Sequence, residues 1–177
     1  MKPSDVSFGR FFLRIAACHT VTYMVVGLTA FHLMDYATAF SREGSNMVPT
    51  DEPIVALGPA LQVVRGLLFA VVLYPFRRVF LDESGGWLKL WGLFLGLAIL
   101  GTSGPAPGSF EGMIFTRTPV VNQIVGLWEA VLQTLFASLL LVAWHRRPRK
   151  AWGIAMYSLW ALTILMSLAG AALSRPG

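Results

Sequence analysis

Charged residues are scarce in this chain. Asp, Glu, Lys and Arg make up only 13% of its 177 residues, while 55% are hydrophobic and the mean hydropathy is +0.63. In an average soluble domain about a quarter of the residues are charged. A buried core does not account for a deficit this large. The composition therefore excludes an ordinary soluble domain and predicts a polytopic membrane protein in which residues 1–177 form one all-α domain.

Cysteine and catalytic motifs are also lacking. Cys18 is the single cysteine, so no disulfide can form within the chain, and it is expected to be a small buried hydrophobe. The sequence has no His-Glu-x-x-His, no Gly-x-Ser-x-Gly and no phosphate-binding glycine loop. Without these motifs, the sequence identifies no catalytic residue. The high pI, about 9.9, is interpreted as contact with anionic lipid rather than with nucleic acid.

Long apolar segments dominate the remaining sequence. A helix needs about 20 mostly apolar residues to cross a bilayer, and runs of this kind predict five transmembrane helices. The first is longer than a signal-peptide core and is expected to remain as a span. The connecting segments are rich in Gly, Pro and polar residues, which end helices. The predicted spans cover residues 11–36, 54–76, 88–103, 120–144 and 152–173.

The basic residues predict an orientation. With the N-terminus in the cytoplasm, ten of the 14 basic residues fall on the inner side, three fall on the outer side, and Arg65 lies within the membrane. Positive charge favours the cytoplasmic side, so we expect a cytoplasmic N-terminus, an outer C-terminus and a bacterial-type plasma (inner) membrane. The inner residues are Lys2, Arg10, Arg14, Arg77, Arg78, Lys89, Arg146, Arg147, Arg149 and Lys150, and the outer ones are Arg42, Arg117 and Arg175.

Two charged residues fall near the middle of predicted spans. Counted from the outer face, Arg65 is about 16 Å deep in the second span and Glu129 is about 14 Å deep in the fourth. Charges at such depth cost at least a few kcal/mol, about 3 kcal/mol on insertion scales, and usually have a partner. Because the two depths agree, the sequence predicts that Arg65 and Glu129 face each other as an ion pair.

Polar residues accompany both charges. Asn122, Glu129 and Gln133 recur at the spacing of one helix face, and Gln62 shares a face with Arg65. These stripes predict a polar site at the midplane. In it Arg65 would bind or balance an anionic group, Glu129 would serve as counter-ion or proton carrier, and the amides would orient them. The alternative is a structural pair that only sets which helices are neighbours.

The outer segment 104–118 combines a Gly/Pro-rich part with an apolar part. It is interpreted either as a re-entrant loop or as an ordinary tight loop. In the first case Glu111 would guard the outer mouth of the site.

Histidines give weaker indications. His19 and His32 are thirteen positions apart on the first span, a spacing that haem-binding cytochromes use, but His145 is the only other histidine and four ligands for two haems are missing. Nitrogen and oxygen ligands at His19, His32 and Asp35 could suit a divalent metal, without a tight ligand spacing. No cofactor is predicted, and one haem in an oligomer stays an alternative.

Function is predicted at the level of class. The leading hypothesis is transport or binding of an ion or a small anionic or lipid-like ligand at the midplane site. The alternatives are an accessory or assembly subunit of a larger membrane complex and, third, a membrane enzyme or haem protein. Besides membrane lipids we expect a second copy of the chain or a partner membrane protein, because five helices enclose little space. The Gly92–Gly96 spacing favours close helix contact, within one copy or between copies.

Overall fold

The architecture is helical throughout the part of the chain that the computed structural model describes, namely residues 6–42, 45, 47–100 and 108–174. Nine α-helices and one short 3-10 helix follow one another there, and these described residues contain no β-strand. The all-α prediction is confirmed for this part of the chain.

Four of the helical segments are long and apolar enough to cross a membrane. They are α1 (Phe8–Leu33), the segment Gly58–Leu81, α8 (Val120–Arg146) and α9 (Lys150–Leu173). The second of these joins α4 (Gly58–Leu73), the 3-10 helix η1 (Tyr74–Phe76) and α5 (Arg77–Leu81). The 3-10 turn coincides with Pro75, which cannot donate a backbone hydrogen bond. These helices agree with a multi-pass membrane protein.

The fifth predicted span is only partly matched. Helix α6 (Gly86–Leu100) has 15 residues, which is about 22 Å of helix, less than the roughly 30 Å of a hydrocarbon core. The predicted segment continues to residue 103, and residues 101–103 lie outside the described part. The structure therefore supports four candidate spans and a shorter apolar helix rather than five full-length spans.

Three short helices complete the chain: α2 (Tyr36–Ser41), α3 (Pro53–Ala56) and α7 (Phe110–Phe115). The first predicted span is cut by the break between α1 and α2, where Asp35 adopts a left-handed φ of 47° and its carboxylate accepts from Thr38 N at 3.5 Å. Tyr36 therefore lies on a separate short helix and not in the first span.

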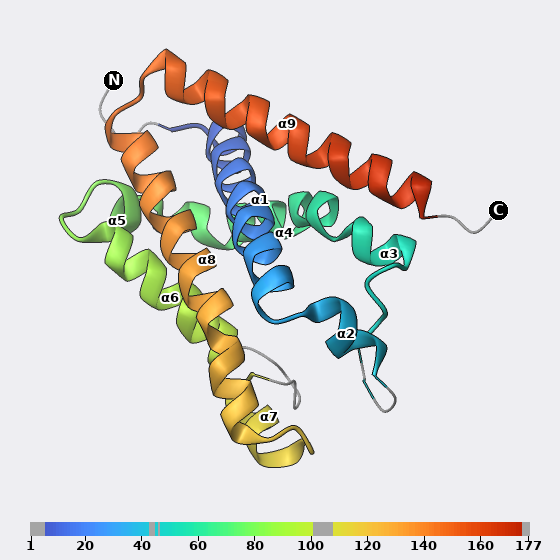
Figure 1. Cartoon of the computed structure of the whole chain (residues 1–177). Helices are drawn as coiled ribbons and strands as arrows, with labels where there is room; N and C mark the ends of the chain where they lie inside the picture. Colours follow the sequence, from blue (N-terminus) through green and yellow to red (C-terminus); the bar gives the residue numbers. More distant parts are fainter. Residues whose placement is uncertain (1–5, 43–44, 46, 101–107, 175–177) are drawn as a thin grey trace.

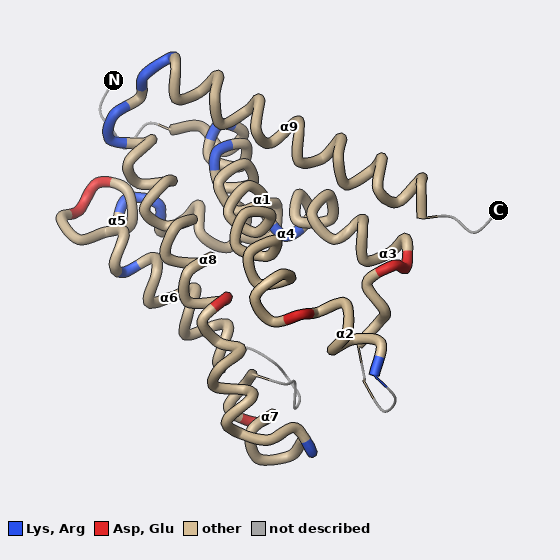
Figure 2. Tube along the Cα trace, in the orientation of Figure 1, with Lys and Arg blue, Asp and Glu red and all other residues tan. Residues whose placement is uncertain are grey.

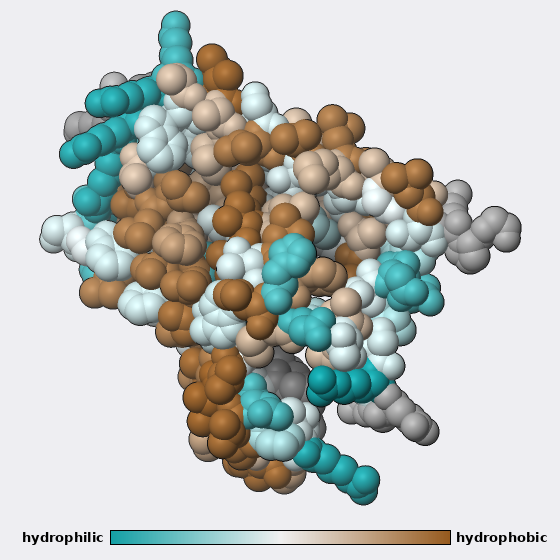
Figure 3. Space-filling view, viewed as in Figure 1, coloured by the Kyte–Doolittle hydropathy of each residue, from teal (hydrophilic) through white to brown (hydrophobic). Residues whose placement is uncertain are grey.

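Helix α1 occupies the centre of the fold. It packs against α4, α8 and α9, as Figure 1 shows, and α6 covers the other side of α8. Its middle turns are almost fully buried, from Ile15 to Val21, and they include Cys18. On the face shown in Figure 3, apolar side chains lie exposed along α6, α8 and α9. Such a surface suits lipid better than water.

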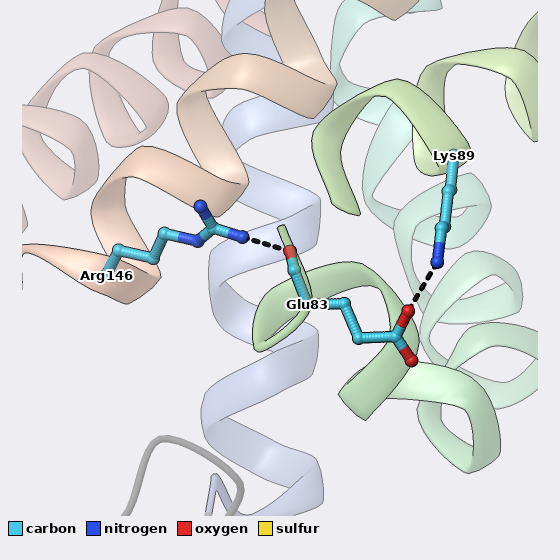
Figure 4. Close-up of polar contacts among 3 residues, drawn as sticks. All are labelled: Glu83, Lys89 and Arg146. Carbon is cyan, nitrogen blue, oxygen red and sulfur yellow. Dashed lines mark hydrogen bonds and ion pairs between the residues drawn. The ribbon is translucent and has the colours of Figure 1, made fainter. Parts of the chain in front are cut away.

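Basic residues gather at one end of the helices. Figure 2 shows them around the start of α1, at α5 and at the turn between α8 and α9. Contacts join these segments: the Arg14 guanidinium lies 5.3 Å from the Trp144 ring centroid, and Arg146 Nε donates to Leu81 O at 3.2 Å. Figure 4 shows Arg146 also donating to Glu83 O, while Glu83 pairs with Lys89. From this end α8 and α9 spread apart (Figure 1).

The α5–α6 turn at the same end depends on glycine. Gly85 has a φ of 72°, a conformation that other residues rarely adopt. A Cβ atom on Gly86 would lie 2.0 Å from Phe80 O. This tight turn lies in the segment expected to connect the predicted spans 54–76 and 88–103.

A side chain from α9 separates α3 from α4. Ser167 Oγ donates to Ala56 O at 2.6 Å and accepts from Ala60 N at 3.2 Å. In a continuous helix Ala60 N would bond directly to Ala56 O, so the serine is inserted into the backbone ladder. Gly170, about one turn further along α9, also faces α3: a Cβ atom there would make an ordinary contact, 3.5 Å, with Ala56 Cβ. This contact ties the end of α9 to α3.

Helices α1 and α4 approach each other closely at Gly66. A Cβ atom on Gly66 would lie 2.7 Å from both Cα and Cβ of Ala16. Real Cβ atoms do not come so close to backbone, so any larger residue at position 66 pushes the helices apart.

We expect Gly66→Ala to lower the free energy of unfolding by about 1–3 kcal/mol, because overpacking strains a tight contact. Thermal unfolding in detergent micelles measures this. Gly92→Ala is the matched control, since no described atom lies within 4 Å of a Cβ there, and alanine should be neutral or slightly stabilising in that helix. Equal stability of the two variants would contradict the close contact.

Candidate functional site

Glu129 on α8 is half-buried and hydrogen-bonded to an unexpected partner. The Tyr36 hydroxyl at the start of α2 donates to Glu129 Oε2 at 2.8 Å. On the other side of the carboxylate lies α1, where a Cβ atom on Gly27 would be 3.8 Å from Oε1. Burial and the hydrogen bond to Glu129 both raise the pKa of Tyr36. The phenol therefore stays protonated and able to donate.

The predicted ion pair between Arg65 and Glu129 is not formed. The ion pairs among the described residues are Lys89–Glu83 and His145–Asp82, and Arg65 is exposed on α4. The physical reason is that α1 packs between α4 and α8. The position of a residue along its helix gives its depth in the membrane. It does not say which neighbouring helix the side chain faces.

The two polar stripes are nevertheless connected, through His19 of α1. His19 Nε2 hydrogen-bonds Gln62 Oε1 at 3.1 Å, and Gln133 Nε2 donates to His19 Nδ1 at 3.2 Å. These partners correspond to the neutral tautomer protonated at Nε2. His19 is 5% exposed, and the Phe69 ring packs edge-on against it at 5.0 Å. One buried imidazole thus joins α1, α4 and α8.

This arrangement bears on the metal and haem candidates. Both His19 ring nitrogens are engaged by glutamines, so neither is directed at a metal or haem iron. His32 is exposed beside Phe31, and Asp35 caps α2. The described residues contain no group of three His, Cys, Asp or Glu side chains that could hold a metal ion.

A cavity of about 590 Å³ lies between α2 and α8. Three residues of the predicted polar stripe, Asn122, Glu129 and Gln133, line it together with Tyr36 and Phe40. Of the six predicted site residues, the cavity therefore brings these three together. Gln62 reaches it only through His19 and Gln133, and Arg65 and Glu111 are not among its lining residues.

A second cavity, of about 340 Å³, adjoins the first. Tyr36, Phe40, Met47 and Glu129 line both, so these side chains form the wall between them. Tyr36 and Phe40 stack with ring centroids 4.8 Å apart and an interplanar angle of 19°. The hydrogen bond from Tyr36 to Glu129 fastens this wall to α8.

The segment that precedes α8 is organised by a residue that the sequence did not single out. Gln123 is 4% exposed; its Oε1 accepts from Gly108 N at 3.0 Å and its Nε2 donates to Thr118 O at 2.7 Å. Its neighbour Asn122 belongs to the predicted stripe, but no sequence pattern distinguished Gln123. Residues 104–107 of the predicted re-entrant loop lie outside the described part. Glu111 is exposed on α7, away from the cavity lining.

The described residues form a helical protein with four helices that are long and apolar enough to span a membrane. No family model, no curated protein and no solved structure matches this chain.

We expect His19→Leu to destabilise the protein by about 1–3 kcal/mol, because it leaves the Gln62 and Gln133 amides without their shared buried partner. Thermal unfolding in detergent measures the loss. His32→Leu, on the exposed surface of the same helix, is the control and should change stability little. If both variants unfold at the wild-type temperature, the His19 network does not hold the three helices together.

Proposed function

We propose that the protein binds, and as a transporter releases, a small ligand or ion in the 590 Å³ cavity between α2 and α8. The observation that carries this proposal is the lining: one carboxylate, Glu129, and three amide side chains of α8 line a cavity within apolar helices. Ligand sites commonly have about 300–1,000 Å³ and a few placed polar groups in apolar walls. An ionisable residue within a membrane helix is a functional candidate by default.

Each polar residue has a proposed role. Glu129 is the counter-charge or proton carrier, and Asn122 and Gln133 orient the ligand by hydrogen bonds. Gln133 also couples the cavity to α1 and α4 through His19. Arg65 does not line this cavity, so it gives no reason to expect an anionic ligand there. Glu111 does not line the cavity either and has no role in the proposed site.

The membrane placement belongs to the same proposal. The basic end, with its arginines from α5 and the α8–α9 turn, lies at the cytoplasmic face of a bacterial-type plasma membrane, in contact with anionic lipid. The N-terminus is then cytoplasmic and the end of α9 is outside. Helix α6 leads from the basic end toward α7, so the chain passes from one face to the other five times even though α6 is short.

We expect Glu129→Gln to weaken ligand retention by about tenfold or more, because the one charged group among the described lining residues is lost while the shape of the cavity is kept. Native mass spectrometry of protein purified gently from membranes measures which small molecules remain bound. Glu111→Gln is the control for loss of an exposed acid. Identical ligand occupancy in wild type and Glu129→Gln would refute the proposal.

A second candidate function, an accessory subunit or homo-oligomer, is favoured by Arg65. This arginine is exposed on a membrane-length helix, among exposed Leu61, Val64 and Leu68. Facing lipid there costs about 3 kcal/mol or more, whereas a partner helix with an acceptor would remove that cost. Gly92 and Gly96 on α6 are likewise not covered by described atoms. Both features suit an assembly through helix contacts.

On this view Arg65→Leu should leave the unfolding temperature of the isolated chain unchanged or raised, since the arginine makes no ion pair within the described chain. Its assembly with partner membrane proteins or with second copies should fall severalfold. Native mass spectrometry and size-exclusion chromatography of the assembly measure this. An unchanged assembly in the Arg65→Leu variant would remove the reason for this second function.

A further inference from the structure

The 340 Å³ cavity differs in chemistry from its larger neighbour. Four of its twelve described lining residues are aromatic: α1 contributes Tyr23 and Phe31, and α2 contributes the stacked pair Tyr36 and Phe40. The remaining lining is mainly aliphatic or thioether side chain, with Thr50 as a further polar group. Aromatic faces carry a negative electrostatic potential, and walls of this type recognise quaternary ammonium groups.

Glu129 is the only carboxylate among the described lining residues of the cavity, and these include no Lys, Arg or His. A carboxylate in apolar surroundings needs either a proton or a positive charge beside it. Arg65, which the sequence predicted as the partner of Glu129, is exposed on α4 and makes no ion pair with the Glu129 carboxylate. No cation of the described chain pairs with this carboxylate, so a bound cation would supply the positive charge that its apolar surroundings favour.

The backbone leaves room for a ligand beside this carboxylate. Gly27 of α1 also lines the cavity and carries no side chain between the helix and Glu129; a Cβ atom there would meet Oε1 at 3.8 Å and no other described atom within 4 Å. Acidic residues Asp35, Asp51 and Glu52 flank the nearby starts of α2 and α3. They attract cations toward this end of the molecule, which Figure 2 shows carrying acidic segments next to α2 and α3.

We propose that the 340 Å³ cavity is a binding site for an organic cation, an ammonium group with an apolar body, held by the aromatic walls with Glu129 as counter-charge. The inference deepens the proposed function, on which it rests, because Glu129 lines both cavities. A bare hard metal ion fits less well: Ca²⁺ requires about six to eight oxygen ligands, and among the described lining residues only Glu129, Tyr23, Tyr36 and Thr50 carry side-chain oxygens.

Three probes of similar size separate charge from shape. Phenyltrimethylammonium carries a fixed positive charge, tert-butylbenzene is its neutral isostere, and benzenesulfonate is an anion of comparable size. Isothermal titration of each into the purified full-length protein in lipid nanodiscs measures affinity, with empty nanodiscs as the blank for partitioning into lipid. Wild type should bind the cation about tenfold or more tightly than the neutral isostere, and the anion most weakly.

Two variants assign the effect to the cavity. Glu129→Gln should abolish the preference for the cation over the neutral isostere while leaving binding of the isostere unchanged. Gly27→Leu, which fills the space beside the carboxylate without removing its charge, should weaken both probes at least tenfold. Glu111→Gln removes an exposed acid away from both cavities and should bind like wild type. Thermal unfolding of each variant establishes that it is folded before titration.

The outcomes separate this inference from the proposed function. Equal binding of the three probes by wild type, or a preference for the anion, overturns the cation site and leaves a ligand cavity in place. A cation preference that survives Glu129→Gln overturns the role of that carboxylate and with it the inference. If wild type binds none of the probes while native mass spectrometry finds a molecule retained through Glu129, the cation site fails and the proposed function stands. If wild type binds none of the probes and native mass spectrometry finds no molecule retained through Glu129, both the cation site and the proposed function are wrong.

Discussion

Helix α1 lies between α4 and α8, and this interposition determines the rest of the site. The close contact of Gly66 with Ala16 holds α4 against α1 and keeps Gln62 within reach of His19. From the other side Gln133 of α8 reaches the same imidazole. In an apolar interior each of these polar groups needs a partner, since an unpaired one costs about 1–3 kcal/mol. The three helices are therefore joined at one buried ring.

The same interposition separates the two central charges. With α1 in between, Arg65 turns to the surface and Glu129 is left with the Tyr36 hydroxyl. A neutral donor stabilises a carboxylate less than a guanidinium would, because hydrogen bonds between two charged groups are the stronger kind. Because Glu129 has only a neutral donor, we propose that it can bind an added positive charge. Because Arg65 is exposed, we propose that its partner lies on another molecule. Both proposals depend on the packing of α1 between α4 and α8.

Local breaks shape the space around Glu129. Asp35, in the left-handed conformation, separates α1 from α2 and places Tyr36 within hydrogen-bonding distance of Glu129, so that Tyr36 and Phe40 line both cavities. Gln123 fixes the segment before α8 with four hydrogen-bond partners, Gly108, Gly112, Thr116 and Thr118. Ser167 holds α9 against the start of α4. Each of these is a single side chain inserted where a helix stops or breaks.

The sequence by itself determined the helical class, four of the long apolar helices and the polar face of α8, because hydropathy and the 3.6-residue period are local properties of the chain. The face on which Asn122, Glu129 and Gln133 meet a cavity was predicted in this way. Tertiary structure alone decided that His19 bridges the glutamines, that Tyr36 is the partner of Glu129 and that Arg65 faces outward. Residue spacing gives a height along each helix, but the partner of a side chain depends on which helix packs beside it, and that choice is made by contacts such as Gly66 on Ala16.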